Sequence, residues 1–456
     1  MLENIFEYSL LSFLLSILLI LLVLVKTNIK MWQLWLLAVG LTYPGAVIAN
    51  HFGAQFLLLI LLAVGTLLVP AIRQLLFTKP LYKVMRKSLP PIGLTESIAL
   101  EAGSVWWDAE LFQGDPNWKE LTELQATELT EEEQNFVDNE VETLCAMVDS
   151  HEIQSTHDLP KEVWKYIFDK GFLGLIIPKE FNGKGFSHFA HAIIVGRLSS
   201  ASQFLGIAVM VPNSLGPGEL LLKYGTDEQK QHYLPRLAEG KEIPCFGLTS
   251  TVAGSDAGSL VDNGIVCYDK FEGKEVLGLR LNWEKRYITL APIATVIGLA
   301  FKAYDPDNLL PEDHPLHKQN DLGITCALIP RETKGLSIGT RHKPIGEPFQ
   351  NGPIFGNDVF IPMDWVIGGD KMLGHGWRML MECLSVGRGI SLPVTGASAT
   401  QAMLLTTSTY SQTREQFGIP IAKMEGIQEK LSNLASNAFR ATANINLSTW
   451  ALDAGH

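Results

Sequence analysis

The chain has 456 residues, and 47% of them are hydrophobic, which is enough for a large core and too many for a disordered protein. Its formal net charge is −12, which argues against nucleic acid as the main partner, because binding to phosphates needs a basic face. The five cysteines are widely spaced, with no Cys-x-x-Cys pair and no neighbouring His cluster. This pattern predicts reduced thiols and no metal site.

The N-terminal region, residues 1–77, is far more apolar than the rest of the chain. Its three apolar runs cover about residues 9–25, 31–49 and 54–72. Each run approaches the length of about 20 residues that a helix needs to cross a bilayer. A signal peptide is disfavoured, because the first ten residues contain no Lys or Arg. We therefore predict a transmembrane region of about three helices that anchors the chain in a membrane.

Charges between these runs predict an orientation, because loops rich in Lys and Arg stay on the cytoplasmic side. Lys26 and Lys30 separate the first two runs, and several basic residues follow the third. No Lys or Arg lies between the second and third runs. The soluble part is therefore expected to face the cytoplasm. Pro44 and Gly45 leave an alternative, in which the second and third runs form a buried or re-entrant hairpin.

A basic connector that contains tryptophans is predicted over residues 78–128. A helical domain follows over residues 129–242. Thr130 is expected to open its first helix, because Glu133 stands three residues later and fits a capping box.

The character of the chain then changes twice. Short β-prone runs separated by turn residues predict an antiparallel β domain over residues 243–372. Helical pattern returns over residues 373–456, and this segment is too short to close a core alone. The predicted fold class is therefore α+β and multidomain: transmembrane helices, a helical domain, an antiparallel β domain and the start of a helical bundle.

The stretch from Cys245 to Ser259 alternates hydroxyl residues with small ones. Small side chains let a ligand approach the backbone, whose N–H groups can then meet its oxygen atoms. Alone, the stretch is equally compatible with a turn at the start of the β domain. No Gly-x-Gly-x-x-Gly follows a strand and no P-loop is present, so the common nucleotide fingerprints are missing.

This stretch resembles the signature of the acyl-coenzyme A (acyl-CoA) dehydrogenase family. Further resemblances follow in the family's order, at Asn213 to Gly216, Lys223 to Pro235, Tyr287 to Thr289, Gly387-Arg388 and Arg414 to Gly418. Together they cover residues 160–430. The apolar head and Trp106-Trp107 are similar to the long, membrane-associated bacterial subgroup of fatty-acid oxidation. Ser250-Thr251 and Met424-Glu425 depart from the family's usual Glu-Pro and Phe-Gln pairs.

The resemblance implies FAD as cofactor, acyl-CoA as substrate, electron-transfer flavoprotein as acceptor, and a homo-oligomer at the inner (cytoplasmic) membrane of a bacterium. It assigns cofactor binding to Phe246, Leu248, Thr249, Ser255, Tyr287, Ile288, Thr289, Arg414 and Gln416. It assigns coenzyme A binding to Ser255 and Arg388. Arg414 is expected to meet the FAD pyrophosphate across a dimer contact.

The resemblance also implies a Glu as catalytic base, in a loop of the last third of the bundle. That position is expected beyond His456, so no catalytic residue is assigned and we expect a C-terminally truncated, inactive product. Two alternatives stay open. One is a membrane-tethered module that binds acyl-CoA or flavin without chemistry, and the other is an acyl-CoA oxidase.

Overall fold

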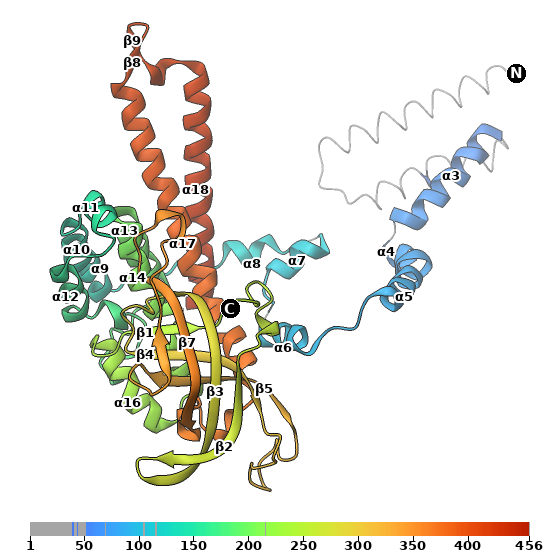
Figure 1. Ribbon diagram of the computed structural model, residues 1–456. Helices are drawn as coiled ribbons and strands as arrows, with labels where there is room; N and C mark the ends of the chain where they lie inside the picture. Colours follow the sequence, from blue (N-terminus) through green and yellow to red (C-terminus); the bar gives the residue numbers. More distant parts are fainter. Residues whose placement is uncertain are drawn as a thin grey trace, which may run out of the picture. The chain divides into compact units, whose positions relative to one another are not determined.

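The computed structural model describes residues 39–40, 43, 52–68, 70–103, 105–114, 116–214 and 216–455 (Figure 1). The chain divides into two compact units, Met1–Gly93 and Leu94–His456. The first predicted membrane run, and all but three residues of the second, lie outside the described residues.

The described part of the first unit is helical. It consists of α3 (Phe52–Leu68), α4 (Pro70–Arg73), a π-helical turn (Gln74–Thr78) and α5 (Lys79–Ser88). The described residues of the third apolar run are helical, and its crossing of a membrane stays a prediction. Among the described residues, the stretch long and apolar enough to span a membrane is Gln203–Tyr224, and 82% of it is buried inside the protein. Such burial is typical of a core helix.

The second unit begins with three short helices, α6 (Leu94–Ala102), α7 (Asp108–Gln113) and α8 (Trp118–Thr122). The Trp107 indole N–H donates to the carbonyl of Asn117 at 3.0 Å, and its ring lies 5.2 Å from that of Trp118. α6 packs on the C-terminal helix α17 (Gly376–Thr413), where the Trp377 indole donates to the carbonyl of Thr95 at 2.9 Å. Trp377 thus joins α6 to α17, and Trp107 joins α7 to the start of α8.

A helical layer follows. Its helices are α9 (Glu131–Phe136), α10 (Glu142–Ala146), α11 (Ser150–Thr156), α12 (Lys161–Asp169), α13 (His188–Ala201), α14 (Gln203–Ser214), α15 (Pro217–Tyr224) and α16 (Asp227–Ala238). A π-helical turn, Val137–Val141, joins α9 to α10. Aromatic and aliphatic side chains of α9 to α14 form one buried cluster.

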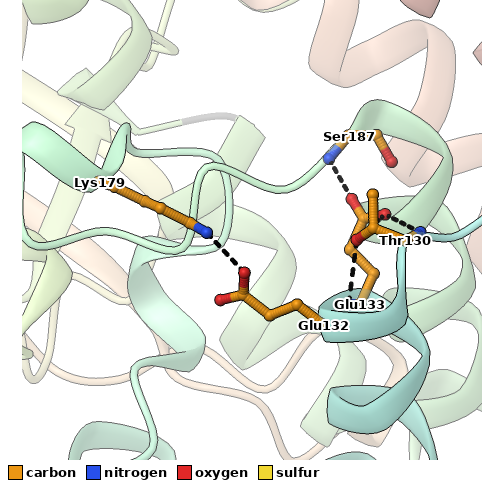
Figure 2. Close-up of polar contacts among 5 residues, drawn as sticks. All are labelled: Thr130, Glu132, Glu133, Lys179 and Ser187. Atoms are coloured by element: carbon orange, nitrogen blue, oxygen red, sulfur yellow. Dashed lines mark hydrogen bonds and ion pairs between the residues drawn. The ribbon is translucent and has the colours of Figure 1, made fainter.

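The predicted capping box at Thr130 is confirmed (Figure 2). The Thr130 hydroxyl accepts from the Glu133 N–H at 3.3 Å, and the Glu133 carboxylate accepts from the Thr130 N–H at 2.8 Å. The same carboxylate accepts from the Ser187 N–H at 2.7 Å, so it joins the start of α9 to the start of α13. Its neighbour Glu132 instead forms an exposed ion pair with Lys179 at 2.5 Å.

The β domain is a seven-stranded sheet in the order β1-β4-β2-β3-β7-β6, with β5 also paired to β4. The strands are β1 (Pro244–Gly247), β2 (Asn263–Phe271), β3 (Lys274–Thr289), β4 (Val296–Tyr304), β5 (Asp321–Pro330), β6 (Leu336–Ile338) and β7 (Asn351–Pro362).

The predicted antiparallel β domain is confirmed for four of the six strand pairs of this sheet and contradicted by two. β1 and β2 both run parallel to β4, whereas the other pairs are antiparallel. β1 pairs with residues 296–299 of β4, and β2 pairs with residues 302–304 on the same edge. The chain therefore leaves this edge after Gly247 and rejoins it at Asn263. The segment between them, residues 248–262, is called the excursion below, and it contains most of the hydroxyl-rich stretch.

The C-terminal part is a helical hairpin, in which α17 and α18 (Glu425–Asp453) lie side by side (Figure 1). Two short strands, β8 (Glu415–Gln416) and β9 (Ile419–Pro420), close its tip. α13 packs against both helices. The Asp453 carboxylate accepts from the N–H groups of His188 and Phe189, at 2.9 and 3.1 Å, which joins the end of α18 to the start of α13.

Candidate functional site

One cavity of about 190 Å³ lies where the sheet meets the helices α14 and α17. Its walls are Val211, Phe246, Leu248, Thr249, Tyr287, Ile288, Thr289, Leu384, Arg388 and Leu392. The structure thus brings most of the sequence-predicted residues together, from β1, the excursion after it, the end of β3 and α17. Val211, Leu384 and Leu392 were missed, because apolar residues on a helix carry no pattern that separates a cavity wall from the core.

The excursion after β1 is held against β3 by backbone pairing. Ser250 forms an isolated antiparallel bridge with Lys285. The Arg286 N–H donates to the carbonyl of Thr249 at 3.1 Å, and the Ser250 N–H donates to the carbonyl of Ala253 at 3.1 Å. These bonds fix Leu248 and Thr249 at the cavity, although neither belongs to a regular strand.

Tyr287 has an unusual backbone conformation, with φ of 57°. A non-glycine residue adopts this left-handed region at a cost of about 1 kcal/mol or more. The β3–β7 pairing shifts register between Lys285 and Ile288. This bulge interrupts the alternation of side chains between the two faces of the sheet at Tyr287. Its ring is 51% exposed and lies 4.8 Å from the ring of His342, with the Arg286 guanidinium 4.8 Å from its centre. The bulge thus presents a flat aromatic face at the cavity.

Polar atoms without partners lie around this wall. The Asn351 side chain is buried, and its amide donates to the Thr289 hydroxyl at 3.5 Å, at the limit of a hydrogen bond. In the described part of the chain, the Asn351 Oδ1 and Ser250 Oγ atoms have no hydrogen-bond partner. Buried polar atoms are normally paired, so these two atoms are exceptions in the layer behind the cavity wall.

The structure does not bring Ser255, Arg414 and Gln416 to the cavity. Ser255 lies exposed in the excursion, and Arg414 and Gln416 lie exposed at the tip of the α17–α18 hairpin. Arg414 follows Arg388 by 26 residues along α17, a separation of about 39 Å in a straight helix. Within one chain this length alone keeps Arg414 from the cavity. Its predicted contact across a dimer stays a prediction.

Beside the cavity, α15 and α17 are joined by a carboxylate. Glu382 pairs with Lys223 at 2.5 Å and accepts from the Tyr224 hydroxyl. Burial raises the pKa of Glu382, but the bonds from Lys223 and Tyr224 outweigh it, so the pKa lies below its usual range. Glu382 is therefore a structural anion. Among the described residues, the cavity walls contain no Asp or Glu.

The comparisons with known proteins agree with this geometry. Residues 123–241 match the model of the acyl-CoA dehydrogenase N-terminal domain, and residues 374–456 match that of the C-terminal domain. The chain is 30% identical over 343 residues to the mitochondrial short-chain specific acyl-CoA dehydrogenase of Bos taurus, covering 73% of this chain and 75% of that protein. The solved FAD complex of PigA is 24% identical and covers 73% of this chain and 82% of its own, with a TM-score of 0.61.

A second match is shorter and has a higher sequence identity. Over 108 residues the chain is 52% identical to Protein HemX of Proteus mirabilis, covering 24% of this chain and 60% of that protein. The likeness to the solved FAD complex of PigA shows the fold, and the two family models with the relative from Bos taurus show the family. The chain belongs to the acyl-CoA dehydrogenase family.

The cavity residues fit FAD, the cofactor that this family membership supports. A flavin ring is flat and apolar on its faces and polar along its edges. Phe246, Leu248 and Tyr287 supply flat and apolar walls, and the hydroxyls of Thr249 and Thr289 supply polar contacts.

Proposed function

We propose that this chain holds FAD and acyl-CoA for the acyl-CoA dehydrogenase reaction, which oxidises long-chain acyl-CoA to trans-2-enoyl-CoA with FAD. The observation that carries the proposal is the convergence of Thr249, Tyr287 and Thr289 on one cavity in a chain of this family. In this reaction a proton leaves the α-carbon and a hydride leaves the β-carbon. Bound FAD would supply the hydride acceptor.

The chain's own residues prepare this reaction. The Thr249 and Thr289 side chains, which line the cavity, would hold the polar edge of the cofactor, and the Tyr287 ring would cover one face. Leu384 of α17 and Val211 of α14 supply a buried apolar wall that would exclude water from one side of the site of hydride transfer.

Arg388 adds a cation at the cavity's helical wall. Its side chain is exposed, and it offers a forked donor of the kind that suits the phosphates of coenzyme A. We assign the general base to none of the described residues.

The first unit supports association with a membrane. α3 has 17 residues, a length of about 26 Å that is close to the thickness of a bilayer's apolar core. The basic helix α5 follows it, with Arg86 and Lys87 in its last turn, where cations favour a cytoplasmic membrane surface. A location at the inner membrane of a bacterium, facing the cytoplasm, supports long-chain substrates, since these partition into membranes. Electron-transfer flavoprotein as acceptor and a homo-oligomeric state complete the proposal.

The test uses the full chain in detergent, supplied with FAD and treated anaerobically with palmitoyl-CoA while visible spectra are recorded. We expect a protein-bound flavin band; its bleaching would show that a general base is present, although we assign none among the described residues. Thr289→Val should weaken FAD binding, whereas Thr406→Val should not, because the Thr406 hydroxyl bonds only to its own helix, at the carbonyl of Ala402.

Other results would favour other functions. A chain that never holds FAD refutes the proposal. Flavin that binds but never bleaches favours the non-catalytic module, and reduced flavin that is rapidly reoxidised by oxygen favours the oxidase.

A further inference from the structure

A fully buried ion pair lies directly behind the strand side of the cavity. The Lys285 ammonium and the Asp262 carboxylate are 2.5 Å apart, and their side chains are 0% and 2% exposed. Lys285 also donates to the carbonyl of Leu248 at 2.9 Å, and Asp262 accepts from the Glu284 N–H at 2.9 Å. Burying two charges is costly, and apolar residues of similar size often stabilise a core equally well. Stability alone therefore does not explain why this ion pair is buried here.

The position of the pair relative to one peptide suggests that role. Leu248 and Thr249 both line the cavity, and the carbonyl between them points at the Lys285 ammonium. The described residues contain no cis peptide bond, and in a trans peptide the C=O and N–H bonds point in opposite directions. The Thr249 N–H therefore points away from the buried ammonium.

The same peptide is fixed and polarised. The carbonyl of Thr249 accepts from the Arg286 N–H at 3.1 Å, so β3 holds the segment on both sides of the peptide. A cation at a peptide carbonyl draws electron density from the N–H at the other end, which makes that N–H a stronger donor. In a water-poor site, a fixed donor of this kind stabilises negative charge without reorganisation.

We propose that Lys285 is a positioning residue of the cofactor site, which orients and polarises the Leu248–Thr249 peptide so that the Thr249 N–H is a fixed, strengthened donor to the polar edge of the flavin. The proposal rests on the FAD binding proposed above. Asp262 keeps the ammonium charged and in place. Lys285 is not among the residues that line the cavity, and its ammonium reaches one of them at this carbonyl.

Two double variants of the full chain separate the orientation of the Leu248–Thr249 peptide from its polarisation. K285M/D262L replaces the pair with apolar groups, and K285Q/D262N keeps neutral hydrogen-bonding groups. K179M/E132L is the matched control, because it removes an ion pair that is exposed and outside the cavity. The measurements are the FAD dissociation constant, the flavin midpoint potential, and the hydrogen exchange of the peptide spanning residues 246–252 without FAD.

For K285M/D262L we expect FAD binding weaker by about tenfold and faster exchange of residues 246–252. We also expect the reduced flavin to be disfavoured by about tenfold, which lowers a two-electron potential by about 30 mV. K285Q/D262N should lower the potential while leaving exchange unchanged. The control should match the wild type in all three measurements.

The proposal is overturned if K285M/D262L folds and its FAD affinity, potential and exchange equal those of the wild type. If that variant fails to fold, K285Q/D262N decides, and an unchanged potential overturns the proposal. If the wild type itself binds no FAD, the proposed function fails separately. The exchange of K285M/D262L then decides the positioning role, and unchanged exchange refutes it.

Discussion

Replacing Glu133 should cost far more stability than replacing its neighbour Glu132, although both are carboxylates in the first turn of α9 (Figure 2). Glu133 is buried and accepts from the N–H groups of Thr130 and Ser187. Glu133→Ala removes the reciprocal cap, worth about 1 kcal/mol. It also leaves the Ser187 N–H without its acceptor, at a cost of about 1–3 kcal/mol. We expect the free energy of unfolding to fall by about 2–4 kcal/mol.

Glu132→Ala is the matched control. Its ion pair with Lys179 joins side chains that are 56% and 65% exposed, and exposed pairs contribute about 0–1 kcal/mol. Urea unfolding of the full chain, followed by tryptophan fluorescence, measures both variants. Equal losses for the two variants would show that the buried carboxylate does not join α9 to α13 as described.

The same carboxylate predicts a pH dependence. Burial raises the pKa of Glu133, but the bonds from Ser187 and Thr130 outweigh burial, so the pKa is lowered in the folded chain. A lowered folded-state pKa means that the contribution is complete above the unfolded-state pKa and is lost as the pH falls. The stability difference between the wild type and Glu133→Gln should therefore shrink as the pH falls below about 4.5. A constant difference would contradict the ionised state.

Three further changes test other parts of the structure. Gly387→Ala should disrupt α17, because the added Cβ atom would lie 1.9 Å from the Ser214 carbonyl oxygen. At Gly389 an added Cβ atom meets no atom within 4 Å, so Gly389→Ala should stabilise the helix by about 0.5–1 kcal/mol in the same unfolding assay. Burial raises the pKa of Glu219 to about 8. The wild type should therefore lose stability as the pH rises from about 4.5 towards 8. E219Q should remove that loss, which urea unfolding at pH 5 and pH 8 would measure. R414A should weaken FAD binding without changing the unfolding free energy, since its side chain is exposed; unchanged FAD affinity in a titration would refute the predicted cofactor contact.

The sequence predicted the helices and most of the sheet because their signals are local. Thr130 and Glu133 lie three residues apart, and the capping box follows from that spacing alone. β3 is one long strand although polar residues interrupt its β-prone pattern, since long-range pairing with β7 continues through them. β7 was missed, because its glycines and prolines have a low strand propensity that pairing with β3 overrides.

The candidate site was predicted only where family motifs mark it. Thr249 and Tyr287 stand in such motifs, but no local pattern shows that one follows an interrupted strand and the other sits on a bulge. The ion pair behind them was not predicted, because Asp262 and Lys285 are 23 residues apart and meet only when the β2–β3 hairpin forms. Such contacts depend on register, which a single sequence does not display.

The two walls of the cavity are stabilised in different ways, and this difference predicts where the site tolerates change. Val211, Leu384 and Leu392 belong to helices whose positions depend on apolar packing, which accepts substitutions that conserve volume. Thr249 and Tyr287 depend on backbone bonds, a bulge and a buried charge, and these admit little adjustment. Changes on the helical wall can therefore reshape the space beside the cofactor while the strand wall stays fixed. Substrate preference is expected to vary through α14 and α17, and cofactor binding to depend on β1 and β3.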